Sequence, residues 1–127
     1  MNKRIIITAS IFGILAVIFG AFGAHILKGI INSSQIETWQ TAVQYHFFHT
    51  LALLFLSTFA RFKNNLINIS SYFFVFGMIF FSGSLYLIAL KDVLSINTSF
   101  IGPVTPLGGL FFIFGWMGLL LAAIKDK

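Results

Sequence analysis

The stretch IIITASIFGILAVIFGAFGAHIL, from Ile5 to Leu27, holds 23 residues without a single Lys, Arg, Asp or Glu. Three similar charge-free stretches follow it, of 23 residues between Glu37 and Arg61, 27 between Lys63 and Lys91, and 32 between Asp92 and Lys125. A helix needs roughly 20 predominantly apolar residues to cross the hydrocarbon core of a bilayer. The sequence therefore predicts an all-α, polytopic membrane protein with four transmembrane helices, at about residues 4–27, 37–60, 68–90 and 106–124.

The composition agrees with a lipid-facing surface. Apolar residues make up 58% of the chain and charged residues 9%, whereas an ordinary soluble domain has about 25% charged residues. A length of 127 residues leaves room for four spans and short connections, so we expect one domain over residues 1–127. The chain has no Cys, which excludes disulfides and thiolate metal sites.

The positive charges are distributed unevenly over the expected connections. Lys28 and Lys91 fall on one side of a four-span arrangement, and six basic residues fall on the other: Lys3, Arg4, Arg61, Lys63, Lys125 and Lys127. Because connections rich in Lys and Arg stay in the cytoplasm, we expect both termini there. The net charge is +5, but no basic stripe with interleaved aromatic residues exists, so we expect no nucleic-acid partner.

The first expected helix begins like a signal peptide, with Lys3 and Arg4 before an apolar run. That run is longer than the roughly 7–15 apolar residues of a signal peptide, so we expect the helix to be retained. Small residues recur in the first and fourth expected helices. In lipid, such residues let helix backbones approach closely. We expect helix packing at Gly13, Gly20, Ala24, Gly108 and Gly115.

The second expected helix has a polar first half. Ser34 and Glu37 match a capping box at its start, and Trp39 suits the membrane interface. Its first three turns carry several further polar residues, so this half must face protein or water rather than lipid. At the fourth helix, Thr105 as the cap and Pro106 at the first helical position mark the start.

Three ionisable side chains lie inside the expected spans, and all are histidines: His25, His46 and His49. Counted from Trp39 at ~1.5 Å per residue, His46 and His49 lie roughly 10 and 15 Å deep. Three roles stay open: structural hydrogen bonding between helices, proton transfer or binding of a polar ligand, and ligation of a metal or haem. Three histidines without a nearby carboxylate make a poor zinc site, so we expect no metal and no cofactor.

Further polar side chains fall in the same half of the expected bundle. We therefore expect a polar pocket around His25, Gln44 and His49, on the side of the membrane away from the termini. Its candidate members are His25, Gln44, His46, His49, Ser82, Ser84 and Tyr86. All three acidic residues lie at membrane edges, which leaves no paired-carboxylate site. A serine nucleophile at Ser82 or Ser84 beside His49 would lack an orienting acid. No catalytic residue is expected.

Five short motifs together resemble the YgdD-like family, also described as domain of unknown function four-two-three. They are Gly20–His25, Phe48–Ala52, Phe81–Tyr86, Val104–Gly109 and Gly115–Trp116. The eukaryotic transmembrane protein two-five-six is similar at a greater distance. The resemblance covers essentially the whole chain and implies a small four-helix membrane protein, in bacteria of the inner membrane, with no assigned activity. His25 and His49 fall on the family's histidine positions, and His46 falls where another polar residue is allowed.

The leading hypothesis is a non-enzymatic integral membrane protein of the cell membrane. It would bind a small molecule or a lipid headgroup in the polar pocket, or support a larger membrane complex. The expected partners are membrane lipid and either a second copy or another membrane protein. The main alternative is a small transporter or channel, although no acidic residue lies within a span. An enzyme of lipid or quinone chemistry comes third.

Overall fold

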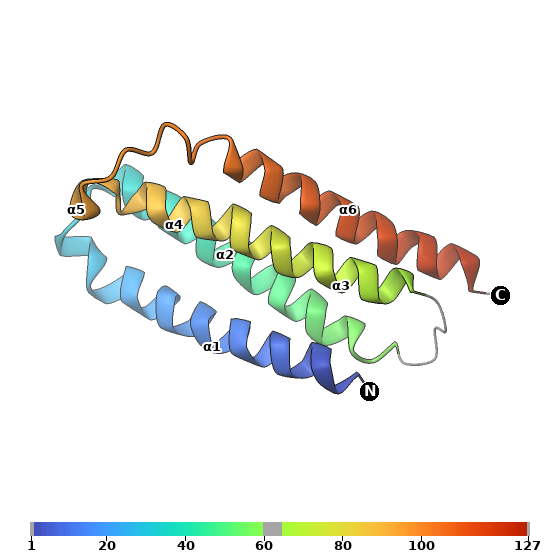
Figure 1. The fold of residues 1–127 in the computed structure, drawn as a ribbon. Coiled ribbons are helices and arrows are strands. Elements are labelled where there is room, and N and C mark those ends of the chain that lie inside the picture. The colour runs from blue at the N-terminus through green and yellow to red at the C-terminus, as the bar shows by residue number, and fades with distance from the viewer. Residues whose placement is uncertain (1, 60–64, 127) are drawn as a thin grey trace.

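The computed structural model describes residues 2–59 and 65–126, and all regular structure in these ranges is helical (Figure 1). The all-α prediction is confirmed. The long helical segments are α1 (Lys3–His25), α2 (Ser33–Leu56), the continuous run of α3 (Leu66–Gly77), η2 (Met78–Ser82) and α4 (Gly83–Ala89), and α6 (Val104–Lys125). Two short helices, η1 (Leu27–Gly29) and α5 (Lys91–Leu94), lie in the connections.

Two helix pairs build the bundle. α1 packs against α2, and α6 packs against α3 and η2. The pairs meet where α2 contacts α3, η2 and α4, so that α1 and α6 are the outermost helices. Figure 1 shows both termini at the same end of the bundle.

Three of the four long segments are long and apolar enough to cross a membrane: Lys3–Gly29, Leu66–Ala89 and Val104–Lys125. α2 has a similar length of 24 residues, but the polar residues of its first half lower its mean hydropathy. By length and composition, the described residues therefore give three candidate spans instead of the predicted four.

The helix boundaries differ from the predicted ones by a few residues. α2 begins at Ser33, because Asn32 and Gln35 form the capping box instead of Ser34 and Glu37. The Gln35 N–H donates to Asn32 Oδ1 at 2.9 Å, and the Asn32 N–H donates to Gln35 Oε1 at 3.0 Å. Gln35 Nε2 also donates to Asp92 Oδ2 at 2.6 Å. This additional bond favours the earlier box.

The end of α2 and the start of α6 also differ from the predicted boundaries. α2 ends at Leu56, and α6 begins at Val104, so Pro106 is its third residue rather than its first. The predicted end of the second span at residue 60 lies outside the described residues. The same holds for Arg61, Lys63 and Asn64, which we expect in a short cytoplasmic turn together with Asn65.

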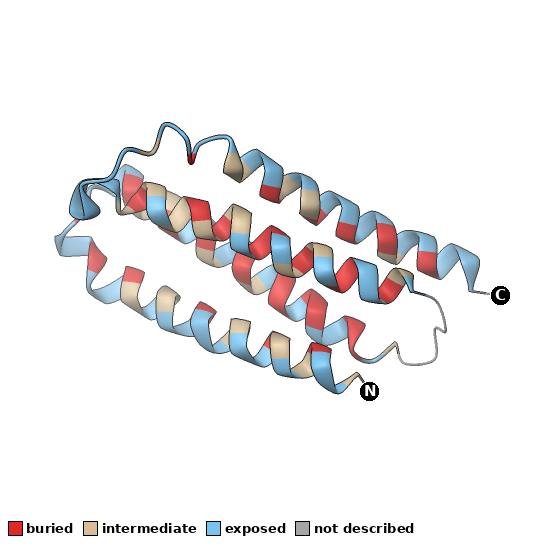
Figure 2. Ribbon diagram, in the orientation of Figure 1, coloured by how far each residue is buried: buried red, intermediate tan, exposed pale blue. Residues whose placement is uncertain are grey.

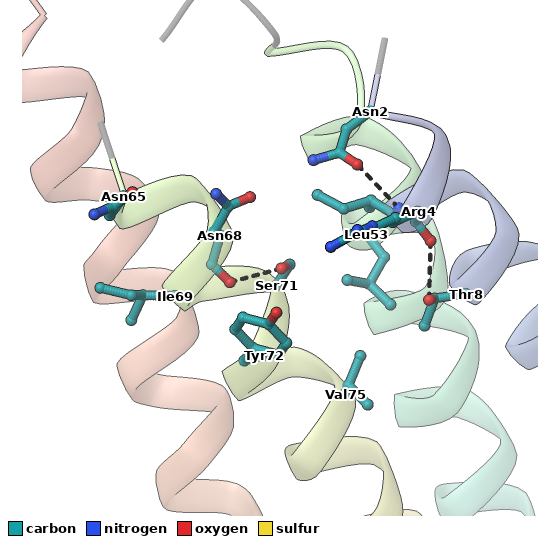
Figure 3. Close-up of a pocket in the computed structure, with 11 residues that line it drawn as sticks. Asn2, Arg4, Thr8, Leu53, Asn65, Asn68, Ile69, Ser71, Tyr72 and Val75 are labelled. Carbon is teal, nitrogen blue, oxygen red and sulfur yellow. Dashed lines mark hydrogen bonds between the residues drawn. The ribbon is translucent and has the colours of Figure 1, made fainter. Parts of the chain in front are cut away.

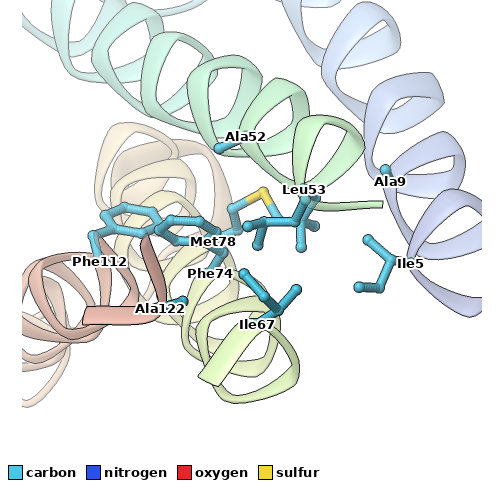
Figure 4. Packing of buried hydrophobic residues seen from close by; sticks show 10 residues of the cluster. Ile5, Ala9, Ala52, Leu53, Ile67, Phe74, Met78, Phe112 and Ala122 are labelled. Carbon is cyan, nitrogen blue, oxygen red and sulfur yellow. The ribbon is translucent and has the colours of Figure 1, made fainter. Parts of the chain in front are cut away.

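Two apolar clusters fill the bundle. The larger one reaches from the end that carries the termini to the middle, and Figure 4 shows its members: Ile5, Ala9, Ala52, Leu53, Leu56, Ile67, Phe74, Met78, Phe112 and Ala122. The smaller one, at the opposite end, consists of Leu27, Ile31, Trp39 and Ala89. Outward-facing positions stay exposed along every helix (Figure 2). Many of these are large apolar residues such as Ile14 and Leu120, as expected where lipid is the solvent.

Glycines set the closest helix contacts between α6 and its neighbours. A Cβ on Gly108 would overlap the backbone nitrogen of Phe81 and lie 2.7 Å from its Cα. A Cβ on Gly115 would lie 2.5 Å from the Phe74 ring. α6 therefore rests directly on the backbone of η2, the π-helical turn, and on an aromatic ring of α3.

On α1 the tightest small residue is Gly23, where a Cβ would overlap the Trp39 ring. The positions expected to pack are looser. A Cβ on Gly13 or Gly20 would meet its nearest neighbouring atom at 3.5 Å, which is ordinary contact, and Ala24 is exposed.

We expect Gly108→Ala to lower the melting temperature of the protein in detergent, because the added methyl group meets backbone atoms that cannot rotate away. Overpacking of this kind costs about 1–3 kcal/mol. Gly83→Ala is the matched control, since nothing lies within 4 Å of its Cβ. The control should be neutral or stabilising by up to about 1 kcal/mol. Equal melting temperatures for the two variants, read by circular dichroism, would contradict the close contact of α6 with η2.

Candidate functional site

His49 is buried between α2 and α6, and both of its ring nitrogens are engaged. Nδ1 lies 2.8 Å from the Tyr45 carbonyl oxygen, which can only accept, so Nδ1 carries the proton. Nε2 then accepts a hydrogen bond of 3.1 Å from the indole N–H of Trp116. The ring also stacks on Phe112, with centroids 3.6 Å apart and planes inclined by 9°.

This geometry requires a neutral imidazole. A proton on Nε2 would place two donors face to face at the Trp116 contact, with no acceptor between them. The His49 ring is thus held by three neighbours and has no nitrogen left for a ligand. The arrangement fits a structural role, in which one side chain links α2 to α6.

His46 points into the other side of the bundle. Its Nδ1 lies 2.9 Å from the Tyr86 hydroxyl of α4. Its Nε2 faces the backbone of Phe12 in α1 but reaches no hydrogen-bond geometry with any described residue. Aromatic rings surround the pair, and Phe19 contacts Tyr86 with centroids 4.9 Å apart. Polar and aromatic contacts here join α1, α2 and α4.

Trp39 belongs to the same aromatic group and is buried rather than positioned as an interface anchor. Its indole N–H donates to the Phe19 carbonyl at 2.8 Å, and its ring lies beside Tyr86 with centroids 4.5 Å apart. The missing side chain at Gly23 makes room for it. This tryptophan therefore fastens α2 to α1.

The two candidate serines also form contacts between helices. Ser82 donates to the Ala42 carbonyl at 2.8 Å, and the Ser84 hydroxyl pairs with the Thr105 hydroxyl at 2.6 Å. Neither serine is hydrogen-bonded to His49. These bonds join η2 and α4 to α2 and α6, and they do not form a nucleophile with its base.

The structure does not bring the seven candidate residues into one pocket. His25 is exposed at the end of α1, and Gln44 is exposed on the outer face of α2. His46 and the two serines are buried in the interior, and Tyr86 is half-buried beside His46. His49 instead borders a groove of about 510 Å³ between α2 and α6.

Gln44 lies in a separate hollow, the α1–α2 groove, of about 580 Å³. Its polar lining comes from one face of α2, at Glu37, Gln40, Thr41 and Gln44, and its small-residue lining comes from α1, at Gly20 and Ala24. Val43, Phe47 and Phe48 add apolar surface at the same place. Sequence reasoning singled out Gln44 but not Glu37, Gln40 and Thr41. Their three- and four-residue spacing is the signal that groups them on one helix face.

The fold and the polar contacts within it are those of a small helical membrane protein. Residues 19–109 match the family model described as protein of unknown function (DUF423). The chain belongs to this family, which confirms the resemblance seen in the sequence motifs. No solved structure matches the chain.

Relatives of known name cover almost the whole chain. It is 37% identical to the UPF0382 membrane protein YwdK of Bacillus subtilis, over 97% of this chain and 98% of that protein. It is 37% identical to the UPF0382 inner membrane protein YgdD of Escherichia coli, over 99% and 93% of the two chains. A UPF0382 membrane protein of Staphylococcus epidermidis is 36% identical, over 97% of each. The protein is thus a cell-membrane protein of an uncharacterised family, as predicted.

The link between His49 and Trp116 can be measured by a double-mutant cycle. His49→Phe leaves the Trp116 N–H without its acceptor, and Trp116→Phe leaves Nε2 without its donor. We expect each change to cost about 1–3 kcal/mol of stability. The double variant should cost less than the sum, because the second change removes the group that the first left unpaired.

Thermal unfolding in detergent measures the four proteins of this cycle. His25→Phe serves as a control outside the core, since His25 is exposed, and it should leave the melting temperature unchanged. Strictly additive losses would mean that the indole and the imidazole do not interact.

Proposed function

We propose that the protein crosses the membrane four times, with both termini in the cytoplasm. α2 packs beside α1 along its length, from Leu53 near Ile5 to Trp39 against Gly23. A helix of 24 residues is about 36 Å long, so α2 extends across the same thickness as the apolar helix beside it. Both termini lie at the same end of the bundle, which agrees with an even number of crossings. The described basic residues at that end, Lys3, Arg4 and Lys125, together with the excess of Lys and Arg that the sequence predicts for that side, support a cytoplasmic location.

We propose that the protein is a non-enzymatic binding protein, and that the α1–α2 groove binds the polar part of an amphiphilic small molecule or lipid. The observation that carries this proposal is the groove itself. Its volume of about 580 Å³ lies in the usual range of ligand sites, which combine an apolar lining with a few polar groups. The groove lies toward the end of the bundle opposite the termini, and therefore in the outer leaflet in the proposed topology.

The side chains of Glu37, Gln40 and Gln44 in the groove are available to an external partner. The Thr41 hydroxyl donates to the Glu37 carbonyl at 3.0 Å, but the side chains of Gln40 and Gln44 have no hydrogen-bond partner among the described residues. A primary amide donates and accepts, and polar groups left in hydrocarbon are costly. An amphiphile with its headgroup beside Glu37 and the two amides, and its apolar part over Phe47 and Phe48, would form hydrogen bonds with the amides. It would also keep these polar groups out of contact with hydrocarbon.

A second candidate function is supported by the helical spacing of the same residues. Glu37, Gln40 and Gln44 are exposed on one face of α2, next to the small residues Gly20 and Ala24 of α1. Small residues and amides are the usual surface for a neighbouring transmembrane helix. The protein would then support a larger membrane complex, with a second copy or another membrane protein over the groove. Transport ranks lower, because His46 and His49 are held by neighbouring side chains.

We expect Gln44→Leu to reduce the amount of amphiphile that co-purifies in mild detergent by up to about tenfold, which corresponds to one hydrogen bond of up to ~1.5 kcal/mol. Native mass spectrometry of the purified protein measures the bound mass. His25→Leu is the control, since it removes a polar group near the same end without altering the lining of the groove. Equal bound ligand in the two variants would contradict ligand binding in the groove.

A crosslinking experiment, read together with the binding measurement, separates the two candidate functions. A Gln44→Cys variant has the only thiol of the chain, so a thiol crosslinker in native membranes reports what covers the groove. Crosslinks to protein, together with unchanged small-molecule binding in Gln44→Leu, would favour the complex over the ligand.

The topology is tested with single cysteines in intact cells. Ser99→Cys, in the exposed connection between α5 and α6, should react with an impermeant thiol reagent. Asp126→Cys, at the end of α6, should react only after the membrane is permeabilised. Labelling of residue 126 from outside would overturn the proposed orientation, and labelling of neither residue in permeabilised cells would mean that the sites are covered.

A further inference from the structure

A third hollow, the α1–α3 pocket, lies at the end of the bundle that carries the termini and has a volume of about 490 Å³ (Figure 3). Arg4 and Thr8 from α1 line one side of it, and Asn68 and Tyr72 from α3 line the other. α1 and α3 each pack against α2, whose residue Leu53 closes the floor between them. None of the seven predicted polar-pocket residues belongs to it.

The polar lining of this pocket is rich in donors. Arg4 supplies a guanidinium, Asn68 an amide N–H and Tyr72 a hydroxyl, while no described carboxylate lines the pocket. Two further hydroxyls are already used within their own helices, since Thr8 donates to the Arg4 carbonyl at 3.0 Å and Ser71 to the Asn68 carbonyl at 2.6 Å. The donors that remain therefore come from both walls, and the only formal charge among these groups is positive.

The lining changes from polar to apolar along the helices. Asn2 and Arg4 lie at the start of α1 and Asn68 is in the first turn of α3, whereas Val75 lies further toward the middle of the bundle. Leu53 is fully buried, and Tyr72 is 63% exposed at the margin. Such a gradient matches an amphiphile whose headgroup is at the membrane surface and whose chain enters the hydrocarbon.

We propose that the α1–α3 pocket binds the phosphate of an anionic phospholipid, with the acyl chain beside Val75 and Ile69. Phosphate oxygens only accept hydrogen bonds, and a guanidinium contacts two of them at once. The start of α1 adds the positive end of a helix dipole. Basic sites between transmembrane helices favour anionic headgroups in this way. The site is distinct from the α1–α2 groove and is independent of what occupies it.

Binding is measured on the full-length protein in a zwitterionic detergent by native mass spectrometry and thermal unfolding. Phosphatidylglycerol should bind and raise the melting temperature, and phosphatidylcholine should do so much less. Arg4→Gln should weaken phosphatidylglycerol binding about tenfold or more, the effect of losing a hydrogen bond to a charged group. Lys91→Gln, which removes one positive charge at the opposite end, is the matched control and should bind as the unmodified protein does.

A second variant, in the α3 wall of the pocket, distinguishes a loss of binding from a folding defect caused by Arg4→Gln. Asn68→Asp places a carboxylate opposite Arg4 and should abolish the preference for phosphatidylglycerol while circular dichroism shows an unchanged helix content. Thermal unfolding is also measured with inorganic phosphate and with glycerol 3-phosphate in place of the lipid. Stabilisation by either one equal to that by the lipid would overturn the lipid assignment in favour of a free phosphate ligand. Unchanged binding in both variants, or equal binding of the two lipids, would overturn the site.

Discussion

Close approach of helix backbones is the constraint on which the rest of the bundle depends. In lipid, apolar side chains gain little by leaving the solvent, so helices associate through tight packing and polar contacts. The contact of Gly108 with the backbone of Phe81 is the tightest of these. It brings α6 onto η2, and from that distance the Phe112 ring can reach the face of His49. The aromatic and polar contacts between α2 and α6 follow from this separation.

Several polar groups inside the bundle occur in pairs that join different helices. Trp116 donates to His49, Ser82 donates to the Ala42 carbonyl, and Trp39 donates to the Phe19 carbonyl. An unpaired polar group in the membrane would cost several kcal/mol, so each partner fixes the position of the other. Two polar atoms without such a partner among the described residues, His46 Nε2 and Ser70 Oγ, are buried and closed off from other molecules. The unpartnered polar groups of the α1–α2 groove and the α1–α3 pocket lie on the outer surfaces. Interaction with other molecules is therefore expected at these surfaces rather than in the interior.

Charge-free stretches and five motifs predicted the helical fold, the membrane location and the family, because the length of an apolar run and the cost of a charge in lipid are local properties. The contacts of His49 could not be predicted in this way. Its partner Trp116 is 67 residues away, and spacing along α2 says nothing about which helix lies opposite. The expected pocket around His25 and His49 is not formed, although α1 packs against α2. His25 is exposed at the end of α1, whereas His49 faces Trp116 of α6.

The π-helical turn at Met78–Ser82 also has no signature in the sequence, since Phe80 and Phe81 suit an ordinary helix equally well. The capping box of α2 shows a different limit. Asn32 with Gln35 and Ser34 with Glu37 are both good local matches, and Asp92, far along the chain, favours the first. The local sequence predicts a capping box at the start of α2, and the contact with Asp92 determines which of the two possible boxes forms.

The bond between Gln35 and Asp92 joins residues 57 positions apart, and this separation has a consequence for biogenesis. Chains are synthesised from the N-terminus, so in the proposed four-span topology α1 and α2 enter the membrane before Asp92 has left the ribosome. During that interval the Gln35 amide already caps α2 through its oxygen, while its nitrogen remains hydrated at the surface. The bonds of Ala42 and His46 with the second hairpin can form as η2 and α4 arrive, and the Gln35–Asp92 bond adds the last of these links when the connection after α4 follows.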